Sequence, residues 1–272
     1  MSPEVLAQRL ALLQHWVGRE ISTRQAMLHP HRPWPVPRTM ADATVTIDPS
    51  NDKLYPSVNS NHVEHFGTSG LASRAILAEI VEIYRAANVD RFFFYLSPSD
   101  QADEIRAWLT EFGLVNMVDL SVLWRPATPL EMSDSRFQID VCTDAHAERL
   151  STVVMECGDD FGYAPATVDM IGSPNFHTLL ATRDDVPAAT GSLYVHEDLG
   201  YLGNGKTLEP YQNQGAQTAL ISARLSLAHS LGCTDLVSET YRFLESSLNN
   251  LKRAGFVELF NRSIYRWESM TR

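Results

Sequence analysis

The chain has 272 residues, of which 44% are hydrophobic, a composition that is typical of one or two packed domains and excludes a disordered chain. Acidic residues outnumber basic ones by 33 to 22, for a formal net charge of -11, so the net field repels phosphate backbones and excludes nucleic acid as an expected partner. The three cysteines, Cys142, Cys157 and Cys233, lack zinc-finger spacing and predict free thiols in a reducing, cytoplasmic compartment. The first residues do not read as a secretory signal and no apolar run is long enough to span a membrane, so we expect a soluble protein with no membrane partner.

The first half of the chain predicts helices and strands in alternation. Ser2 and Pro3 form a cap and first-turn pair that predicts an opening helix, and four prolines between His29 and Arg38 exclude helix there. Strand-like alternation begins at Ala43. The pattern then predicts a helix over 71–87, an aromatic-rich strand buried on both faces over 91–96, a helix over 101–112 and a strand over 115–124.

The second half predicts a mixed sheet with helices against it. A polar stretch with two prolines ends near Arg136 and is the predicted interdomain linker. The predicted strands cover 137–142, 176–181, 188–195, 201–208, 235–240 and 257–267, and the predicted helices cover 144–157, 217–231 and 245–254. The order β-α-β-β-β-α-β-α-β predicts an α/β fold with a mixed, α+β type of sheet.

The two halves end alike. A shift of 142 positions places Leu109, Gly113, Val115 and Ser121 on Leu251, Gly255, Val257 and Ser263. Each set predicts a helix, a glycine stop and a strand. We therefore predict two similar domains, 1–126 as a degenerate copy and 136–272 as the functional one, joined by a linker over 127–135.

The most informative segment runs from Thr207 to Leu220, with the sequence Thr-Leu-Glu-Pro-Tyr-Gln-Asn-Gln-Gly-Ala-Gln-Thr-Ala-Leu. A predicted strand leads to a turn with one glycine, Gly215, and a helix starts at once. The first backbone N–H groups of such a helix lack partners and, with the helix dipole, suit a pyrophosphate. Glycine lets a phosphate approach the main chain. The alternative is an ordinary strand-to-helix turn.

This segment resembles the coenzyme loop of the GNAT acetyltransferases, written Arg/Gln-x-x-Gly-x-Gly/Ala. Gln212, Gly215 and Gln217 fall on its three fixed positions, although Gln217 departs from the small residue usual there. The element order from the loop to Gly255-Phe256 and the last strand also matches. The resemblance covers roughly residues 136–267 and implies a GNAT-like fold, in tandem form with the N-terminal copy degenerate.

The resemblance implies an acyl-CoA-dependent N-acetyltransferase that uses acetyl-CoA as cosubstrate and no metal. The acceptor would be the amine of a small molecule or peptide, which attacks the thioester directly in a ternary complex. The coenzyme would lie where two central strands splay apart, with a backbone N–H of the splayed strand at the oxyanion. The residues implied to bind it are Thr207, Leu208 and Glu209 at the pantetheine, Gln212, Asn213, Gln214, Gly215, Ala216 and Gln217 at the pyrophosphate, and Asn250 in the late helix. The oligomeric state is left open, with a homodimer as one option.

The sequence contains one candidate base and two candidate acids for the reaction. Many relatives have a tyrosine four residues before the Gly-Phe pair, where this chain has Leu251. Glu239, at the end of a predicted strand beside the splay, is the candidate base, with a solvated or structural carboxylate as the alternative. Tyr241 and Tyr265 are each an acid or a core residue. The unusual Leu251 keeps open a second function, a catalytically silent acyl-CoA-binding or scaffold protein.

Histidine pairs provide the other candidate sites. His29 with His31, and His62 with His65, have spacings that metal sites sometimes use, but neither pair has a third ligand nearby in the sequence. We therefore predict no metal site.

Overall fold

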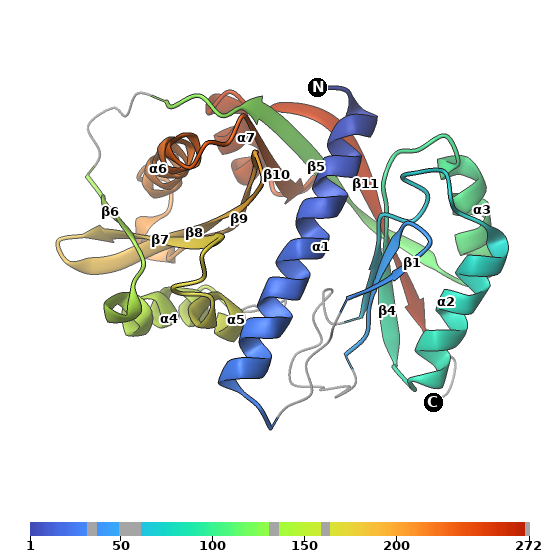
Figure 1. Ribbon diagram of the computed structural model, residues 1–272. Coiled ribbons are helices and arrows are strands. Elements are labelled where there is room, and N and C mark those ends of the chain that lie inside the picture. Colours follow the sequence, from blue (N-terminus) through green and yellow to red (C-terminus); the bar gives the residue numbers. More distant parts are fainter. Residues whose placement is uncertain (32–36, 49–60, 131–135, 159–163, 270–272) are drawn as a thin grey trace. The chain divides into compact units, whose positions relative to one another are not determined.

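The computed structural model describes residues 1–31, 37–48, 61–130, 136–158 and 164–269. The chain forms two compact units (Figure 1). Unit 1 comprises Met1–Ser121 and Leu259–Arg272, and unit 2 comprises Val122–Glu258.

Unit 1 is a small sheet with helices on both faces. Its elements are α1 (Pro3–Leu28), β1 (Arg38–Met40), β2 (Ala43–Thr46), β3 (His62–Glu64), α2 (Arg74–Ala86), β4 (Arg91–Leu96), α3 (Ala102–Glu111), the first part of β5 (Val115–Pro126) and most of β11 (Val257–Glu268). The strand order includes β1-β2-β3-β4-β11, in which β3 and β4 are parallel. Helices α2 and α3 lie on one face and α1 on the other, where His15 Nδ1 lies 3.3 Å from Thr44 Oγ1 (Figure 1).

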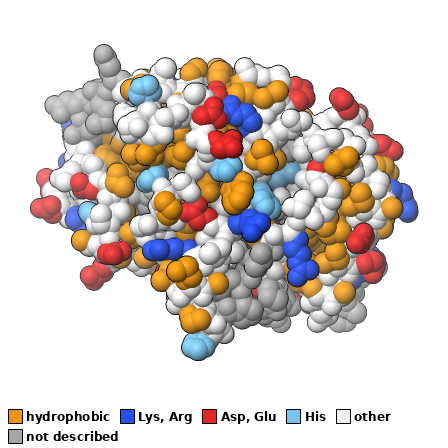
Figure 2. All heavy atoms as spheres, in the orientation of Figure 1, with side chains coloured by type: hydrophobic (Ala, Val, Ile, Leu, Met, Phe, Trp, Pro, Cys, Tyr) orange, Lys and Arg blue, Asp and Glu red, His pale blue; other side chains and the backbone are white. Residues whose placement is uncertain are grey.

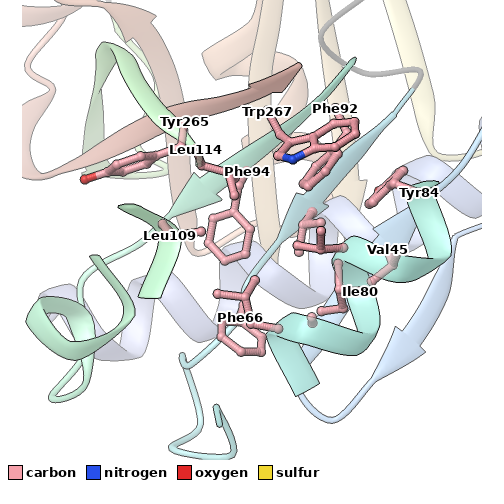
Figure 3. Close-up of a cluster of buried hydrophobic side chains, with 14 of the residues drawn as sticks. Val45, Phe66, Ile80, Tyr84, Phe92, Phe94, Leu109, Leu114, Tyr265 and Trp267 are labelled. Atoms are coloured by element: carbon pink, nitrogen blue, oxygen red, sulfur yellow. The ribbon is translucent and has the colours of Figure 1, made fainter. Parts of the chain in front are cut away.

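Aromatic side chains form the core of unit 1 (Figure 3). The ring of Tyr84 stacks on Phe92 at 4.1 Å, and Phe92 stacks on Trp267 at 5.4 Å. The Tyr84 hydroxyl donates 2.8 Å hydrogen bonds to the carbonyls of Thr46 and His62, so this fully buried phenol is satisfied. The burial of β4 confirms that its aromatic run is core.

Unit 2 contains the elements predicted for the second half, apart from most of the last strand, with short additions. They are β6 (Gln138–Val141), a 3-10 turn at Asp144–His146, α4 (Ala147–Glu156), α5 (Ala164–Asp169), β7 (Phe176–Arg183), β8 (Val186–His196), β9 (Leu199–Thr207), a 3-10 turn at Glu209–Tyr211, α6 (Ala216–Ser230), β10 (Asp235–Tyr241) and α7 (Glu245–Arg253). The order β6-β7-β8-β9-β10 is antiparallel until β9 and β10, which are parallel. Helix α6 covers one face of this sheet and α4 the other (Figure 1). The predicted mixed α/β fold is confirmed.

The predicted glycine stops after α3 and α7 have the same geometry. Gly113 and Gly255 have φ values of 82° and 84°. The N–H of Leu114 donates to the Leu109 carbonyl at 2.9 Å, and the N–H of Phe256 donates to the Leu251 carbonyl at 3.1 Å. Both helices therefore end in one type of left-handed cap, which glycine adopts without strain.

The predicted domain limits and the two units differ at the last strand. The sequence assigns 136–272 to the second domain, whereas β11 pairs with β4 from Ser263↔Leu96 to Glu268↔Arg91 and belongs to unit 1 from Leu259 onward. Residues 131–135 of the predicted linker lie outside the described residues. The division into domains at 126 and 136 stays a prediction.

The surface carries charges of both signs. On the face shown in Figure 2, acidic and basic side chains are interspersed and no broad basic patch is seen. Among the described residues, no helix is long and apolar enough to cross a membrane.

Candidate functional site

The candidate site of unit 2 begins where β9 and β10 stop pairing. Their parallel ladder runs from Leu199↔Asp235 to Leu202↔Ser238 and ends there, although β9 continues to Thr207 and β10 to Tyr241. At the last rung the Ser238 hydroxyl donates a 2.8 Å hydrogen bond to the Leu202 carbonyl. Two neighbouring parallel strands thus stop pairing before their carboxyl ends. Open α/β sheets bind ligands at this edge.

Strand β9 also contains a bulge beyond this point. Ser192 of β8 pairs with Gly203, but Thr190 pairs with Lys206, so β9 has an extra residue in this interval. The extra backbone passes through Asn204, which has a left-handed φ of 53°. Bulges re-aim backbone groups and side chains and are common beside active sites.

The connection from β9 to α6 is bonded to the sheet at its start. The N–H of Leu208 donates to the Ala188 carbonyl at 2.9 Å, and the Leu208 carbonyl accepts from the N–H of Tyr211 at 2.9 Å. The Glu209 carbonyl accepts from the N–H of Gln212 at 3.2 Å. These backbone groups of Leu208 and Glu209, expected at the pantetheine, therefore already have partners within the protein.

The segment Gln212–Gly215 forms an exposed loop in front of α6. Gly215 is the N-terminal cap of α6 with a φ of 93°, and a Cβ added to it would meet no atom within 4 Å. Asn213 is also left-handed, with a φ of 59°. Ala216 is 1% exposed, so its side chain packs inward and only its main chain faces the loop. The main chain in front of the helix is thus exposed, a condition that an anion site at a helix N-terminus requires.

A cation that sequence reasoning missed lies against this loop. The guanidinium of Arg183, at the end of β7, donates a 2.6 Å hydrogen bond to Gln214 Oε1, whose Nε2 donates to the Pro210 carbonyl at 2.6 Å. Gln214 therefore links Arg183 to Pro210, two residues before the loop. Arg183 and Gln214 are 31 residues apart in the sequence, so sequence reasoning could not connect them.

The Gln217 side chain does not face the loop. Its amide nitrogen donates to the Lys206 carbonyl and to Thr207 Oγ1, each at 2.9 Å, and lies 3.3 Å from the Thr190 carbonyl. The departure from a small residue at this motif position therefore has a structural reason, because the side chain turns back to the sheet. Only its main chain is placed to meet a ligand of the loop.

Glu239 is half-buried on β10, just past the end of the ladder. The hydroxyl of Tyr201 donates to its Oε2 at 3.3 Å. Burial, and then the charge of Glu239, raise the pKa of Tyr241, so this phenol keeps its proton at neutral pH. A carboxylate and two phenols thus gather at the open end of β9 and β10.

No family model and no curated protein matches the sequence. Solved structures resemble it over most of its length. A GCN5-related N-acetyltransferase from Kribbella flavida has a TM-score of 0.64 at 13% identity, covering 98% of this chain and 96% of that chain. Another from Sphaerobacter thermophilus has a TM-score of 0.60 at 14% identity, covering 84% and 81%. A tandem GNAT protein from the clavulanic acid biosynthesis pathway has a TM-score of 0.59 at 14% identity, covering 83% and 78%.

The chain has the GNAT fold. The two strands that the sequence resemblance predicts to splay are β9 and β10, whose pairing ends early, and the predicted coenzyme loop is the exposed segment before α6. Glu239 follows the last rung of the β9–β10 ladder, and Gln217 joins the start of α6 to the end of β9. The tyrosine position of many GNAT relatives is occupied by Leu251, which is 5% exposed and packs with Phe256 in the core.

Two other predicted site residues have contacts that do not include this group. Asn250 is half-buried on α7 and accepts a hydrogen bond from Arg253 one turn later. Tyr265 belongs to unit 1, is 4% exposed and is part of the buried hydrophobic cluster of that unit, which favours the core alternative for this residue (Figure 3). In the described part of the chain, no group of three or more His, Cys, Asp or Glu side chains could hold a metal ion.

Proposed function

We propose that this protein is an N-acyltransferase that moves the acetyl group of acetyl-CoA to the amine of a small molecule or peptide. The observation that carries the proposal is the early end of the β9–β10 ladder beside an exposed, glycine-capped helix N-terminus in a GNAT fold. A split pair of parallel strands offers backbone to an extended chain such as pantetheine, and the helix N-terminus suits a pyrophosphate.

In the proposed complex the main chain of Gln212, Asn213, Gln214, Gly215, Ala216 and Gln217 wraps the pyrophosphate. The open space where a Gly215 Cβ would stand supports this placement, since phosphate oxygens need to approach the main chain there. Arg183, linked to the loop through Gln214, supplies positive charge that the loop itself lacks. The pantetheine arm extends from Thr207 toward the gap between β9 and β10.

The proposed reaction is a direct attack of the neutral amine on the thioester carbonyl. The carbon–nitrogen bond forms, the carbonyl oxygen becomes an oxyanion held by a backbone N–H in the bulge of β9, and the carbon–sulfur bond then breaks. Coenzyme A leaves as a thiolate and takes a proton from solvent. Glu239 accepts the proton of the amine, directly or through water, because it follows Ser238, the last paired residue of β10. Holding both substrates side by side supplies much of the rate.

A second function deserves a test, because Leu251 is buried where many relatives have a tyrosine. A protein with this change could bind acyl-CoA without transferring the acyl group. The discriminating experiment has two arms, calorimetric binding of acetyl-CoA and release of free coenzyme A thiol across polyamines, aminoglycosides, amino acids and peptides. Binding with amine-dependent thiol release supports the transferase. Binding without release on any amine supports the silent protein, and no binding contradicts both.

A further inference from the structure

Two side chains of α6, Gln217 and Arg224, reach the bulged part of β9 from the helix side. We propose that they are positioning residues that hold the bulge in the shape needed for acyl transfer, and that Gln217 has this role in place of a coenzyme contact through its side chain. The inference rests on the proposed function of this site. It concerns unit 2 alone, where both side chains and both strands lie.

Arg224 is a buried cation whose hydrogen bonds go to backbone carbonyls. It is 3% exposed, and its Nη1 lies 3.2 Å from the carbonyls of both Ser192 and Gly203, while its Nε donates to the Leu220 carbonyl at 3.1 Å. One nitrogen therefore joins β8 to β9 at the rung where the bulge begins. Burial lowers its pKa to about 10, so it still carries a charge at neutral pH.

A glycine on β8 makes room for this guanidinium. A Cβ added to Gly191 would lie 2.8 Å from Arg224 Cζ, closer than side chains tolerate. Burying an arginine without a carboxylate carries a desolvation cost that carbonyl contacts only partly offset. An apolar residue of similar volume would avoid this desolvation cost. The buried arginine therefore indicates that hydrogen-bond donors are needed to hold the backbone at this rung.

Gln217 holds the other end of the bulge. Its amide nitrogen donates to the carbonyl of Lys206, the residue at which β9 resumes pairing with Thr190 of β8, and to Thr207 Oγ1. A Cβ added to Gly205 would lie 3.0 Å from Gln217 Oε1, so glycine again allows the approach.

The two residues are seven positions apart, two turns of helix, and so extend from the same face of α6. Between their contacts at Gly203 and Lys206 lie the peptide groups of Asn204 and Gly205. A backbone N–H stabilises an oxyanion only if it is already aimed at the position of that oxygen, because turning it during the reaction costs free energy. Two anchors, one on each side of the bulge, fix that aim.

The test compares Gln217→Ala and Gln217→Glu with a matched control, Ser226→Ala, an exposed position on the same helix. Alanine restores the small residue of the motif, and glutamate keeps the shape but cannot donate. We expect both Gln217 variants to bind acetyl-CoA within about threefold of wild type and to lose about tenfold or more in kcat, since one misplaced oxyanion donor costs about a hundredfold or more. The control should match wild type, and exchange of the backbone amides over 203–206 should be faster in both Gln217 variants.

Arg224→Lys, which keeps the charge but not the fork of donors, is the companion variant, and Arg224→Met removes both. We expect kcat to fall in the order wild type, lysine, methionine, with folding followed by circular dichroism. If the Arg224 variants do not fold, the two Gln217 variants still test the inference. Unchanged kcat in both Gln217 variants would overturn the inference, and so would a coenzyme affinity that falls in parallel with kcat. If the wild type is active in the same assay, the proposed function still holds. A wild type that releases no thiol with any amine would overturn both.

Discussion

The hydroxyl of Ser263 donates a 2.8 Å hydrogen bond to Asp119, and Ser121 faces Asn261 at 3.5 Å in the reciprocal arrangement. Both pairs lie within unit 1, and the shift of 142 positions that relates Ser121 to Ser263 also relates Asp119 to Asn261. Strands β5 and β11 therefore present equivalent positions to each other. Together with the identical caps at Gly113 and Gly255, this reciprocity supports the internal repeat predicted from the sequence.

The loop of the N-terminal copy already holds an anion of its own. Asp42 accepts hydrogen bonds from the N–H of Gly67 and the N–H of Ser69, each at 2.9 Å, and from the Ser69 hydroxyl at 3.0 Å. A carboxylate at these donors would compete with a phosphate. We therefore predict one acetyl-CoA per chain by calorimetry, bound by unit 2. A stoichiometry of two would contradict this prediction.

Gly215→Glu should abolish coenzyme binding and leave the protein folded. The added carboxylate would stand where the pyrophosphate is proposed to lie, while the open space around Gly215 spares the core. A side chain at a φ of 93° costs about 1–2 kcal/mol of stability. Calorimetric titration with acetyl-CoA and a thermal melt measure the two effects.

Gly70→Glu is the control for that strain. Gly70 also has a positive φ, 76°, and open space around its Cβ position, but lies in the loop before α2 of unit 1. We expect the same loss of stability with normal coenzyme affinity. Equal affinity in the Gly215 and Gly70 variants would remove the loop before α6 from the proposed site.

Much of unit 2 could be predicted from the sequence because its signals are local. Ladder ends, in contrast, depend on the partner strand, so nothing in β9 or β10 alone indicates that pairing stops at Leu202 and Ser238. The same reason hid Arg183, whose partner lies 31 residues away. Arg224 gave one overlooked signal, a charged residue on the apolar face of α6, four residues after the buried Leu220. Strand β3 escaped prediction because three residues are too few for a visible alternation.

Glu64 is expected to stabilise unit 1 through its buried contacts with Arg262 and His65. Its carboxylate lies 3.4 Å from the guanidinium of Arg262, whose side chain is 0% exposed, and 3.6 Å from His65 Nε2. Removing one partner of a buried pair costs about 3–5 kcal/mol. Glu64→Gln should lower the free energy of unfolding by this order. Glu111→Gln, which breaks the solvent-exposed pair with Arg74, should leave the free energy of unfolding nearly unchanged.

The Glu64 carboxylate should also make the stability of the protein depend on pH. Burial raises the pKa of Glu64, but the contacts with His65 and the charges of His65, His62 and Arg262 outweigh it and leave the folded-state pKa well below the ordinary value of 4.5. A depressed folded-state pKa adds stability that is complete above 4.5 and decreases as the pH falls below it. The free energy of unfolding, measured by chemical denaturation, should therefore fall more steeply below that pH in the wild type than in Glu64→Gln. Parallel curves would contradict a special role for this carboxylate.

Arg183→Gln should weaken acetyl-CoA binding about tenfold, since a hydrogen bond to a charged group is worth about 1.5–3 kcal/mol. The affinity of this variant should also depend less on salt concentration, because one cation near the phosphates is lost. Comparison of coenzyme A with dephospho-coenzyme A tells whether Arg183 meets the 3′-phosphate or the pyrophosphate. Arg149→Gln is the matched control, since Arg149 hydrogen-bonds the Asp185 carbonyl and is not linked to the loop. Equal loss in the two variants would indicate a general effect of net charge.

Glu239→Gln tests the proton chemistry of the proposed reaction. If Glu239 accepts the amine proton, kcat/KM should fall by about a hundredfold or more, while the dissociation constant of the coenzyme stays nearly unchanged. Glutamine keeps an oxygen that can accept from the Tyr201 hydroxyl, so the contact seen at 3.3 Å need not be lost. Tyr201→Phe is the matched variant, because it removes that hydrogen bond and keeps the carboxylate. A small effect of Tyr201→Phe beside a large one of Glu239→Gln assigns the loss to the carboxylate itself. Under the rival account, in which the amine loses its proton to solvent before binding, Glu239→Gln turns over at a near-normal rate and the pH–rate profile still follows the amine. That result would discard the base while leaving the proposed transferase in place.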